Sequence, residues 1–371
     1  MLSRIDIFCD VIDNFGDAGV TYMLAEALKS ELPGSEIRLF TNDLNAFSAL
    51  KSRIDPSKTV QELNGIEFFS YSVLTEGFVK GYEIPKLVIE AFACQIPAAY
   101  YEKALDSDCL IINLDHLSAE LWIEGVHLKE SLTGRKARKY FFMPGFTTAS
   151  GGLIQDRLLS GEEKSEKRKY FESRFGFSDG GLLISIFTYE HDFARFFNDI
   201  RTVGKKTNII VFGEKSRNSI EKLHVNGANI SIVYADFIPQ EDYDDLLKVC
   251  DLNFVRGEDS WSRACLSGKP FIWHSYHQKD NYQQVKVKAF LEYQKEHYVD
   301  KKLFEQYFDY LMNFNDRTPG LSDKPVLFML ENLETFEKYN IKSAEHLIKN
   351  CNLIKKLLFF ARSFDKDKKL I

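Results

Sequence analysis

The stretch CDVIDNFGDAGV, residues 9–20, joins a predicted buried strand to a predicted helix. Residues 5–12 are rich in β-branched and apolar side chains, as expected for a strand inside a sheet. From Val20 onward the apolar side chains return at helical spacing. Between the two elements the chain carries two acids, Asp13 and Asp17, in a turn. A strand, an acidic turn and a helix in this order indicate an α/β fold.

The same alternation continues through both halves of the chain. Further segments with strand character are EIRLF (36–40), CLIINL (109–114), LLISIFTY (182–189), NIIVFG (208–213), NISIVY (229–234), DLNFVR (251–256) and PFIWH (270–274). Helical segments separate them, which is typical of parallel sheets. A charged stretch without strand character divides the two groups. We therefore predict an α/β domain at 1–155, a helical connector at 156–178, a second α/β domain at 179–342 and a helical segment at 343–371.

The composition suits a globular protein with two cores and excludes several functions. The chain has 371 residues, of which 44% are hydrophobic and 27% charged. A net charge of -6 and a pI near 5.9 give no general attraction to nucleic acid or to an anionic membrane. The cysteines are far apart and form no CxxC pair, as expected for reduced core residues. Because no signal segment or membrane-length apolar run is present, the sequence predicts a cytoplasmic protein.

The two acids of the opening turn allow a structural and a functional interpretation. Either Asp13 or Asp17 alone could be an ordinary turn or helix-capping residue. Two like charges in one tight loop, however, are costly unless a cation or a shared proton compensates them. Gly16 and Gly19 leave the G-x-G-x-x-G dinucleotide pattern incomplete, and acids here would repel a pyrophosphate. The loop is therefore a poor site for NAD.

A second candidate site is FVRGEDSWSRACLSGKPFIWH, residues 254–274. Ser260 is a plausible N-cap for the helix that follows the predicted strand. Free amide groups at a helix start suit a phosphate, and Arg256 and Arg263 could add positive charge. Glu258 is better suited to accepting hydrogen bonds from sugar hydroxyls. On these residues alone, an ordinary capped helix with surface Arg–Glu pairs is the favoured alternative.

Aromatic and amide side chains at other predicted strand ends could bind a planar base. Tyr189, Phe237 and Tyr243 could stack on the base, and Gln240 could bind its edge through paired hydrogen bonds. Packing in the core is the commoner role of any single aromatic residue. The histidines show no metal-ligand spacing and there is no D-x-D motif, so the sequence predicts a site without a metal.

Five long segments match a known family in the same order, over roughly residues 5–278. They are IDIFCDVIDNFGDAGVTYMLAEAL, LDHLSAELWIEGVH, FFMPGFTTASGGL, FIPQEDYDDLLKVCDLNFVRGEDS and SGKPFIWH. Together they resemble the bacterial protein-arginine rhamnosyltransferases that modify translation elongation factor P, the EarP family.

This resemblance implies a glycosyltransferase of the GT-B fold, in which two Rossmann-like domains face each other across a cleft. It implies transfer of L-rhamnose from the co-substrate TDP-β-L-rhamnose to an arginine of elongation factor P, with inversion. No metal, further cofactor, nucleic acid or membrane is expected. Domain 1–155 would bind the acceptor and domain 179–342 the nucleotide sugar.

The resemblance implies the catalytic residues, and the positions at strand ends, helix starts and the opening turn indicate the other site residues. The expected catalytic residues are Asp13, Asp17 and Glu258. The expected donor-binding residues are Tyr189, Phe237, Gln240, Tyr243, Arg256, Gly257, Asp259 and Ser260. The residues expected to shape the acidic loop are Asn14, Phe15, Gly16 and Gly19.

The chemistry of the acceptor gives the two acids a purpose. An arginine side chain arrives charged, with a pKa above about 12, and is a poor nucleophile. A carboxylate can hold the guanidinium in a fixed orientation, and another can accept the proton that leaves as the C–N bond forms. From the resemblance, we assign Asp17 as the base and Asp13 as its orienting partner.

Three positions depart from the family pattern: Met23 stands where an arginine is common, and Leu132 and His277 stand where proline is common. They concern the finer contacts and not the reaction type. Two alternatives share the predicted architecture. One is a different GT-B nucleotide-sugar enzyme, such as an epimerase, and the other is a protein that binds a nucleotide sugar without catalysis.

Overall fold

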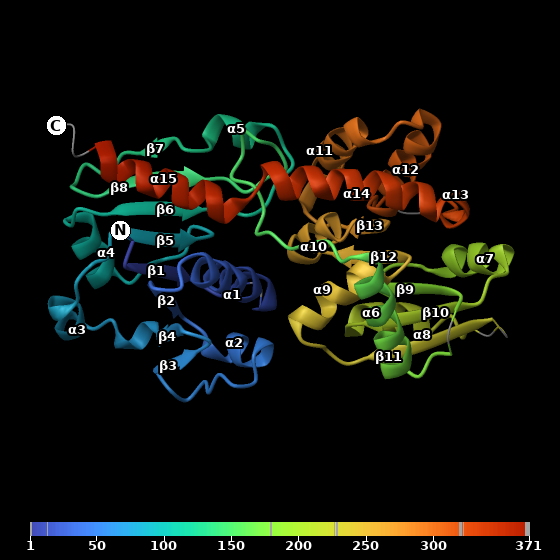
Figure 1. Ribbon diagram of the computed structural model, residues 1–371, viewed down its shortest axis with the longest axis horizontal. Helices are drawn as coiled ribbons and strands as arrows, with labels where there is room; N and C mark the ends of the chain where they lie inside the picture. The colour runs from blue at the N-terminus through green and yellow to red at the C-terminus, as the bar shows by residue number, and fades with distance from the viewer. Residues whose placement is uncertain are drawn as a thin grey trace. The chain divides into compact units, whose positions relative to one another are not determined.

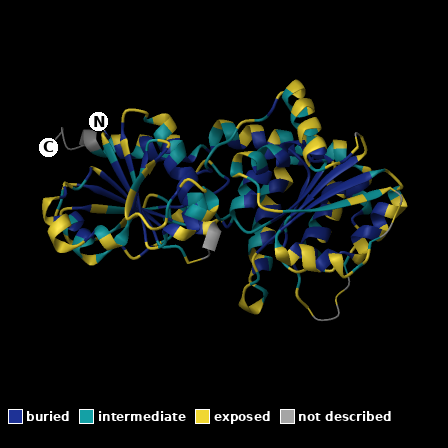
Figure 2. Cartoon of the chain, turned by 90° about the horizontal axis from the view of Figure 1, so that it is seen from below, coloured by how far each residue is buried: buried dark blue, intermediate teal, exposed yellow. Residues whose placement is uncertain are grey.

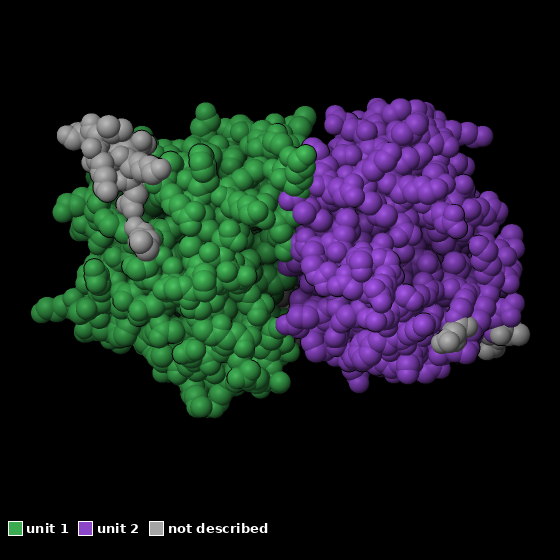
Figure 3. All heavy atoms as spheres, in the orientation of Figure 1, with its two compact units in different colours: residues 1–155, 349–371 green, residues 156–348 purple. Residues whose placement is uncertain are grey.

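The computed structural model describes residues 2–12, 14–178, 180–225, 227, 229–318, 321 and 323–367. The chain forms two compact units, shown in different colours in Figure 3. Unit 1 comprises Met1–Gln155 with Lys349–Ile371, and unit 2 comprises Asp156–Ile348. The predicted connector 156–178 therefore lies in unit 2, and the predicted segment 343–371 is divided between the units. Among the described residues, no helix has the length and apolar character needed to cross a membrane.

Unit 1 is built on an eight-stranded sheet with the order β3-β4-β2-β1-β5-β6-β8-β7 (Figure 1). Its strands are β1 Arg4–Cys9, β2 Glu36–Thr41, β3 Val60–Leu63, β4 Ile66–Ser70, β5 Leu87–Ala91, β6 Leu110–Leu114, β7 Glu130–Ser131 and β8 Arg138–Phe142. Neighbours are parallel except at the two edges, where β3 is antiparallel to β4 and β7 to β8. The central strands β5 and β6 are buried along their whole length because helices cover both faces (Figure 2).

The winding of this sheet locates the expected ligand position. Numbered in chain order, the parallel strands follow the order 3-2-1-4-5-6, so the sheet is doubly wound. The winding reverses between β1 and β5, whose last residues Cys9 and Ala91 lie in register. Ligands of such sheets bind outside the carboxyl ends of the strands at this switch point. In unit 1 that position is formed by the loops that follow β1 and β5.

Helices pack on both faces of the sheet of unit 1. They are α1 Asn14–Glu31, α2 Leu44–Leu50, α3 Glu76–Gly81, α4 Ala98–Leu105, α5 Trp122–Val126 and α15 Leu353–Asp367, with a 3-10 turn at Tyr71–Val73. One buried cluster joins the sheet to α1, α2 and α15, and another joins it to α3 and α4. The unit is thus a three-layer α/β structure.

The helix α15 completes the core of unit 1 although it comes from the far end of the described chain. Its side chains Leu353 and Leu357 belong to the same buried cluster as α1. The approach to α15 is fixed by two hydrogen bonds of 2.8 Å, from Leu153 N to Cys351 O and from Leu353 N to Leu153 O. Gly152 has φ +80°, and a Cβ there would lie 2.3 Å from Cys351 O. Only glycine permits this close approach.

Unit 2 is built on a second doubly wound sheet, with five parallel strands in the order β11-β10-β9-β12-β13. Its strands are β9 Leu182–Ile186, β10 Thr207–Phe212, β11 Ile230–Ala235, β12 Leu252–Arg256 and β13 Phe271–His274. In chain order this is 3-2-1-4-5, and the winding reverses between β9 and β12. The loops that follow these two strands form the switch point of unit 2.

The helices of unit 2 surround this sheet and extend beyond it. They are α6 Gly161–Arg174, α7 Ala194–Val203, α8 Glu214–Glu221, α9 Gln240–Val249, α10 Asp259–Ser267, α11 Gln283–Gln294, α12 Lys301–Phe314, α13 Leu327–Glu331 and α14 Leu333–Asn350, with 3-10 turns at Lys279–Asn281 and Lys295–His297. Helix α6, in the predicted connector, starts with a capping box formed by Ser160 and Glu163. It is joined to α9 by the ion pair Arg174–Asp242 (2.6 Å). The connector is therefore packed as part of unit 2.

Candidate active site

The loops at the switch point of unit 1 are joined by hydrogen bonds to acidic side chains. Ile12 N donates to Asp17 Oδ2 (3.0 Å), which ties the end of the β1 loop to helix α1. Asp10 Oδ2 accepts the N–H of Gln95, in the loop after β5 (2.7 Å). Because each carboxylate uses one oxygen on a backbone amide, both side chains have a fixed orientation at the edge of the sheet.

Helix α1 begins at Asn14, earlier than the predicted start near Val20. Asn14 and Phe15 are its first residues, and Gly16 and Gly19 lie within it. The prediction that these four residues shape a loop is therefore wrong. The helix can start early because an acidic side chain in the first turn, here Asp17, is stabilised by the free amide groups.

Asp17 is buried and lies close to the end of β1. Burial raises the pKa of the Cys9 thiol to about 12, and the charges of Asp17 and Asp10 add to the effect, so Cys9 is a neutral core thiol. All six cysteines are buried and free, as the sequence predicted. Asp13 lies outside the described residues, and its pairing with Asp17 stays a prediction. Met23, one of the departures from the family pattern, is buried in α1.

The loop after β5 contains a feature that the sequence analysis missed. Phe92 and Ala93 have φ of +58° and +52°, a left-handed conformation that is costly for residues with a side chain. Phe92 N donates to Leu114 O (2.7 Å), and the Phe92 ring stacks on His116 with 4.3 Å between centroids. The loops after β5 and β6 are thus held together. No local pattern predicts two consecutive left-handed residues without glycine.

The edge of unit 1 formed by the carboxyl ends of β1, β5, β6 and β8 is acidic. The sequence contains no lysine or arginine in 5–28, 87–102, 104–128 or 140–156, the segments that carry these strand ends. Acids in the described loops and first helical turns there are Asp10, Asp17, Asp115, Glu120 and Glu124. Lys356 of α15 also reaches this edge, but its ammonium group donates to the carbonyls of Thr147, Thr148 and Ser150. The edge therefore suits a cationic ligand.

In unit 2, Arg256 lies at the switch point and is held by aromatic rings. Its guanidinium carbon lies 4.2 Å from the centroid of Phe187 and 5.1 Å from that of Tyr189, and Nη1 donates to Thr188 O (3.3 Å). This stacking joins the end of β12 to the loop after β9. Phe187 was missed by the sequence analysis, although it stands two residues before Tyr189 in the same quoted segment.

The turn between β12 and α10 requires glycine. Gly257 has φ +66°, its N–H donates to His274 O (3.2 Å), and its carbonyl accepts the indole N–H of Trp273 (2.8 Å). Helix α10 begins at Asp259, and Glu258 occupies the N-cap position without a side-chain capping bond. The predicted N-cap at Ser260 is therefore wrong, since Ser260 is buried inside the first turn. The Glu258 carboxylate lies 3.5 Å from Lys286 Nζ.

The first turn of α10 is linked to α9 by buried charges. Arg263 lies 3.7 Å from Asp259 Oδ1 and 3.8 Å from Asp244 Oδ2. Burial raises the pKa of Asp259, and it raises the pKa of Asp244 to about 6, with Arg263 opposing both shifts. Gln240 Nε2 donates to Asp244 Oδ1 (2.9 Å). The amide predicted to bind a base is thus positioned by the neighbouring acid.

The other two predicted donor-binding aromatics have different surroundings. Tyr243 is buried between the rings of Phe187 (6.1 Å) and Phe212 (5.7 Å). Phe237 is exposed, with its ring 6.3 Å from Phe187. Of these two rings, Phe237 is the exposed one, whereas Tyr243 packs against Phe187 from the core.

Two histidines and an arginine, His274, His277 and Arg317, cluster beside Tyr189, a grouping that the sequence analysis missed. His274 is fully buried, 5.4 Å from the Tyr189 ring and 5.0 Å from His277. Burial lowers the pKa of His277 to about 4, and the charge of Arg317 adds to the effect. Arg317 contacts the His277 ring and donates to Glu190 O (3.1 Å). The departure at His277 thus has a defined partner.

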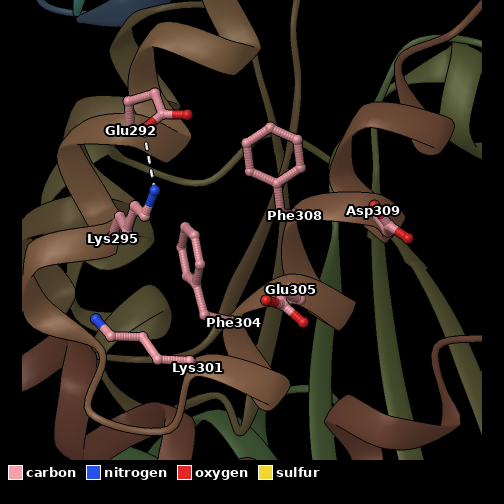
Figure 4. Close-up of a pocket in the computed structure, with 7 residues that line it drawn as sticks. All are labelled: Glu292, Lys295, Lys301, Phe304, Glu305, Phe308 and Asp309. Carbon is pink, nitrogen blue, oxygen red and sulfur yellow. Dashed lines mark ion pairs between the residues drawn. The ribbon is translucent and has the colours of Figure 1, made fainter.

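A hollow in unit 2 lies away from the strand-end loops. This hollow of about 270 Å³ lies between α11 and α12, lined by Phe304 and Phe308 with charged groups around them (Figure 4). It contains no residue of the loops after β9, β12 or β13. Within the described part of the chain, no group of three or more His, Cys, Asp or Glu side chains could hold a metal ion. The candidate site is therefore assigned to the strand-end loops.

Two doubly wound units with polar groups at their switch points define the GT-B fold, an architecture of glycosyltransferases and of other nucleotide-sugar enzymes. A solved structure that concerns EarP-mediated arginine glycosylation of translation elongation factor EF-P aligns with this chain with a TM-score of 0.59 at 22% identity. The alignment covers 97% of this chain and 99% of that chain. MurG of Acinetobacter baumannii has a TM-score of 0.50 at 11% identity, with coverage of 97% and 99%. At these identities the likeness concerns the fold alone.

Sequence comparison is more specific. The family described as Elongation-Factor P (EF-P) rhamnosyltransferase EarP matches residues 5–362. A curated protein-arginine rhamnosyltransferase from Pseudomonas putida is 35% identical over 311 residues, which cover 78% of this chain and 81% of that protein. Another from Shewanella oneidensis is 35% identical over 329 residues, which cover 78% of this chain and 80% of that protein. The chain belongs to the EarP family of rhamnosyltransferases.

Proposed function

We propose that this chain transfers L-rhamnose from TDP-β-L-rhamnose to an arginine side chain of translation elongation factor P, with inversion at the anomeric carbon. The observation that carries the proposal is that cations are found at the switch point of unit 2 but not in the strand-end segments of unit 1. The strand-end segments of β1, β5, β6 and β8 lack lysine and arginine, whereas in unit 2 the end of β12, the first turn of α8 and the segment after α12 place Arg256, Lys215 and Arg317 near Tyr189. An acidic edge suits a guanidinium, and a basic edge suits a diphosphate.

The acceptor side of the reaction is assigned to Asp17. A guanidinium nitrogen attacks the anomeric carbon and gives its proton to Asp17 as the C–N bond forms. The glycosyl C–O bond breaks on the opposite face, which inverts the carbon, and the modified arginine remains a cation. The N–H of Ile12 holds Asp17 Oδ2 in place, so the carboxylate is oriented before the substrate arrives. Asp13 would pair with the rest of the guanidinium.

The donor side is assigned to the start of α10 and to Arg256. The leaving TDP gains negative charge as the glycosyl bond breaks, and the amide groups of the first turn can stabilise it. The stacked guanidinium of Arg256 adds a fixed positive charge. Phe237 offers an exposed ring to the base. Glu258, near Lys286, would accept a hydrogen bond from a rhamnose hydroxyl, and the proposal uses no metal at this position.

The test is to incubate the purified protein with TDP-β-L-rhamnose and elongation factor P and to measure the intact mass of the acceptor. We expect a gain of one rhamnosyl group on an arginine, with α configuration at the anomeric carbon by NMR. Release of TDP with unmodified elongation factor P would indicate a different nucleotide-sugar enzyme. Binding of TDP-rhamnose without release of TDP would indicate a non-catalytic protein.

A further inference from the structure

We propose that Leu121 and Trp122, at the start of α5, form a docking surface for the acceptor protein beside its target arginine. These two residues are called the α5 surface below. The inference rests on the proposed function, because it assumes that the acceptor is a folded protein that presents an arginine to unit 1. It adds a contact that recognises the protein around that arginine.

The topology of the sheet places α5 at the edge that carries Asp17. Strand β6 ends at this edge, β8 is parallel to β6, and β7 is antiparallel to β8. The helix between β6 and β7 must therefore lie at the carboxyl ends of the strands, as Figure 1 shows. Two hydrogen bonds confirm this position: Ser118 N donates to Pro144 O (3.2 Å), and Met143 N donates to His127 Nδ1 (3.1 Å).

The α5 surface is rigid but exposed. Ile123 is buried and packs so closely on Gly145 that a Cβ there would lie 2.5 Å from Ile123 Cδ1. Glu124 Oε1 accepts the hydroxyl of Thr147 (2.6 Å). In contrast, the next residues in the N-terminal direction, Leu121 and Trp122, are 75% and 54% exposed. Large apolar side chains on a preformed support lose little conformational entropy on binding and are typical of protein interfaces.

Contacts between loops connect the α5 surface to the candidate active site. The segment that leads into α5 contains His116, which stacks on Phe92. In the loop that contains Phe92, the N–H of Gln95 donates to Asp10 Oδ2. Asp10 lies in the loop after β1, which leads to Asp17. Ile12, whose amide binds Asp17, is itself strongly exposed. Apolar and acidic groups therefore alternate along one edge of unit 1.

The charge of this edge defines the partner. Because its strand-end segments lack lysine and arginine, a partner with a cationic loop is attracted and an acidic one is repelled. The occupant of the α5 surface is therefore an apolar side chain of the acceptor protein, close to the arginine that enters the acidic loop. Tryptophan is among the residues that most often carry the binding energy at the centre of a protein–protein interface.

The experiment compares Trp122→Ala and Leu121→Ala with Leu132→Ala as a matched control. Leu132 is 90% exposed and follows β7, which runs away from the carboxyl edge. We expect the two α5 variants to raise the KM and the Kd for elongation factor P at least about 10-fold. The KM for TDP-rhamnose, the kcat at saturating acceptor and the unfolding midpoint should not change. Leu132→Ala should behave as the wild type in every measurement.

A further variant, Trp122→Lys, keeps the side chain long and exposed but repels a cationic partner, so it should weaken acceptor binding more than Trp122→Ala. Unchanged Kd and KM for elongation factor P in all three variants would overturn the docking surface, as would a fall in kcat alone. The proposed function fails separately, if the wild type transfers no rhamnose. In that case calorimetric binding to elongation factor P still decides the role of the α5 surface.

Discussion

Asp17 combines burial, a helix start and a hydrogen bond to its own loop. Asp17→Asn can still accept the N–H of Ile12 but cannot accept a proton. We therefore expect kcat to fall by roughly two to four orders of magnitude, with little change in the Kd for TDP. The measurement is rhamnosyl transfer under saturating substrates, with TDP binding followed by calorimetry.

Asp10→Asn is the matched control, because Asp10 also uses one oxygen on a backbone amide, that of Gln95, at the same edge. It should retain turnover within about 10-fold of the wild type. If both variants lose activity equally, the effect comes from the loop structure and not from a base. Near-normal turnover of Asp17→Asn would also contradict the assignment.

Arg256 offers a second test at the scale of one residue. Lysine keeps the charge but lacks the planar guanidinium that stacks on Phe187 and Tyr189. A stacked cation contributes about 0.5 to 2 kcal/mol, so Arg256→Lys should weaken TDP binding by about 2- to 30-fold. Lys286→Arg is a control at a nearby cation, and its TDP affinity should stay unchanged. An unaltered Kd for Arg256→Lys would place the diphosphate elsewhere.

At the scale of elements, strand β1 contains a buried acid with an unusual pH dependence. Asp6 accepts hydrogen bonds from Tyr82 (2.7 Å) and Tyr100 (2.5 Å), and burial raises its pKa from 3.8 to about 6. Because the folded state binds this proton more tightly, the group stabilises the fold below pH 3.8 and loses that contribution as pH rises through about 6. The difference corresponds to about 3 kcal/mol.

Asp6→Asn should remove this dependence. The free energy of unfolding of the variant, relative to the wild type, should rise by up to about 3 kcal/mol between pH 4 and pH 7. Urea unfolding at several pH values measures the difference. Asp244 in unit 2, whose pKa burial raises to about 6 as well, is unaffected and serves as an internal reference. A constant difference across this pH range would show that Asp6 does not titrate there.

Helix α15 can be tested through two neighbouring positions of opposite burial. Leu357 is fully buried in the core of unit 1, whereas Phe359 is 77% exposed. Leu357→Ala should cost about 2 to 5 kcal/mol of stability because it leaves a cavity. Phe359→Ala should change stability by no more than about 0.5 kcal/mol. Equal effects in thermal or urea unfolding would mean that α15 does not pack as described.

These elements also show what the sequence could and could not predict. Strands β1, β2, β6, β9, β10, β11, β12 and β13 were predicted because apolar runs bounded by turns are local signals. The starts of α1 and α10 were missed because acids and glycine in a first turn resemble a loop. The packing of α15 on α1 was missed because nothing local connects residues so distant in the chain.

In the candidate site, too, residues with local sequence signals were predicted and contacts between distant residues were not. Arg256 and Phe237 were selected from their positions at strand ends, and the structure places both near Phe187. Phe187 itself, and the group formed by His274, His277 and Arg317, depend on strand order and on contacts between distant loops. Periodicity and spacing carry no information about such contacts.

For the whole molecule, the two switch points should respond to different substrates. TDP should slow amide hydrogen exchange in 187–191 and 256–262 of unit 2 and leave 10–17 of unit 1 unchanged, because the acidic edge repels a diphosphate. Elongation factor P should protect the loops of unit 1. Exchange measured by mass spectrometry on the full chain tests both statements. Protection of 10–17 by TDP alone would contradict the assignment of the donor to unit 2.

The discontinuity of unit 1 has a consequence for protein synthesis. Residues 353–361 supply part of its buried core, but the ribosome makes them only after all of unit 2. At synthesis rates of about 5–20 residues per second, unit 2 can fold first, while the sheet of unit 1 waits for tens of seconds at most with part of one face uncovered. During that interval the nascent chain exposes apolar strands, and it is then a natural client for a chaperone. The acidic edge would thus become competent only after the rest of the enzyme has been built.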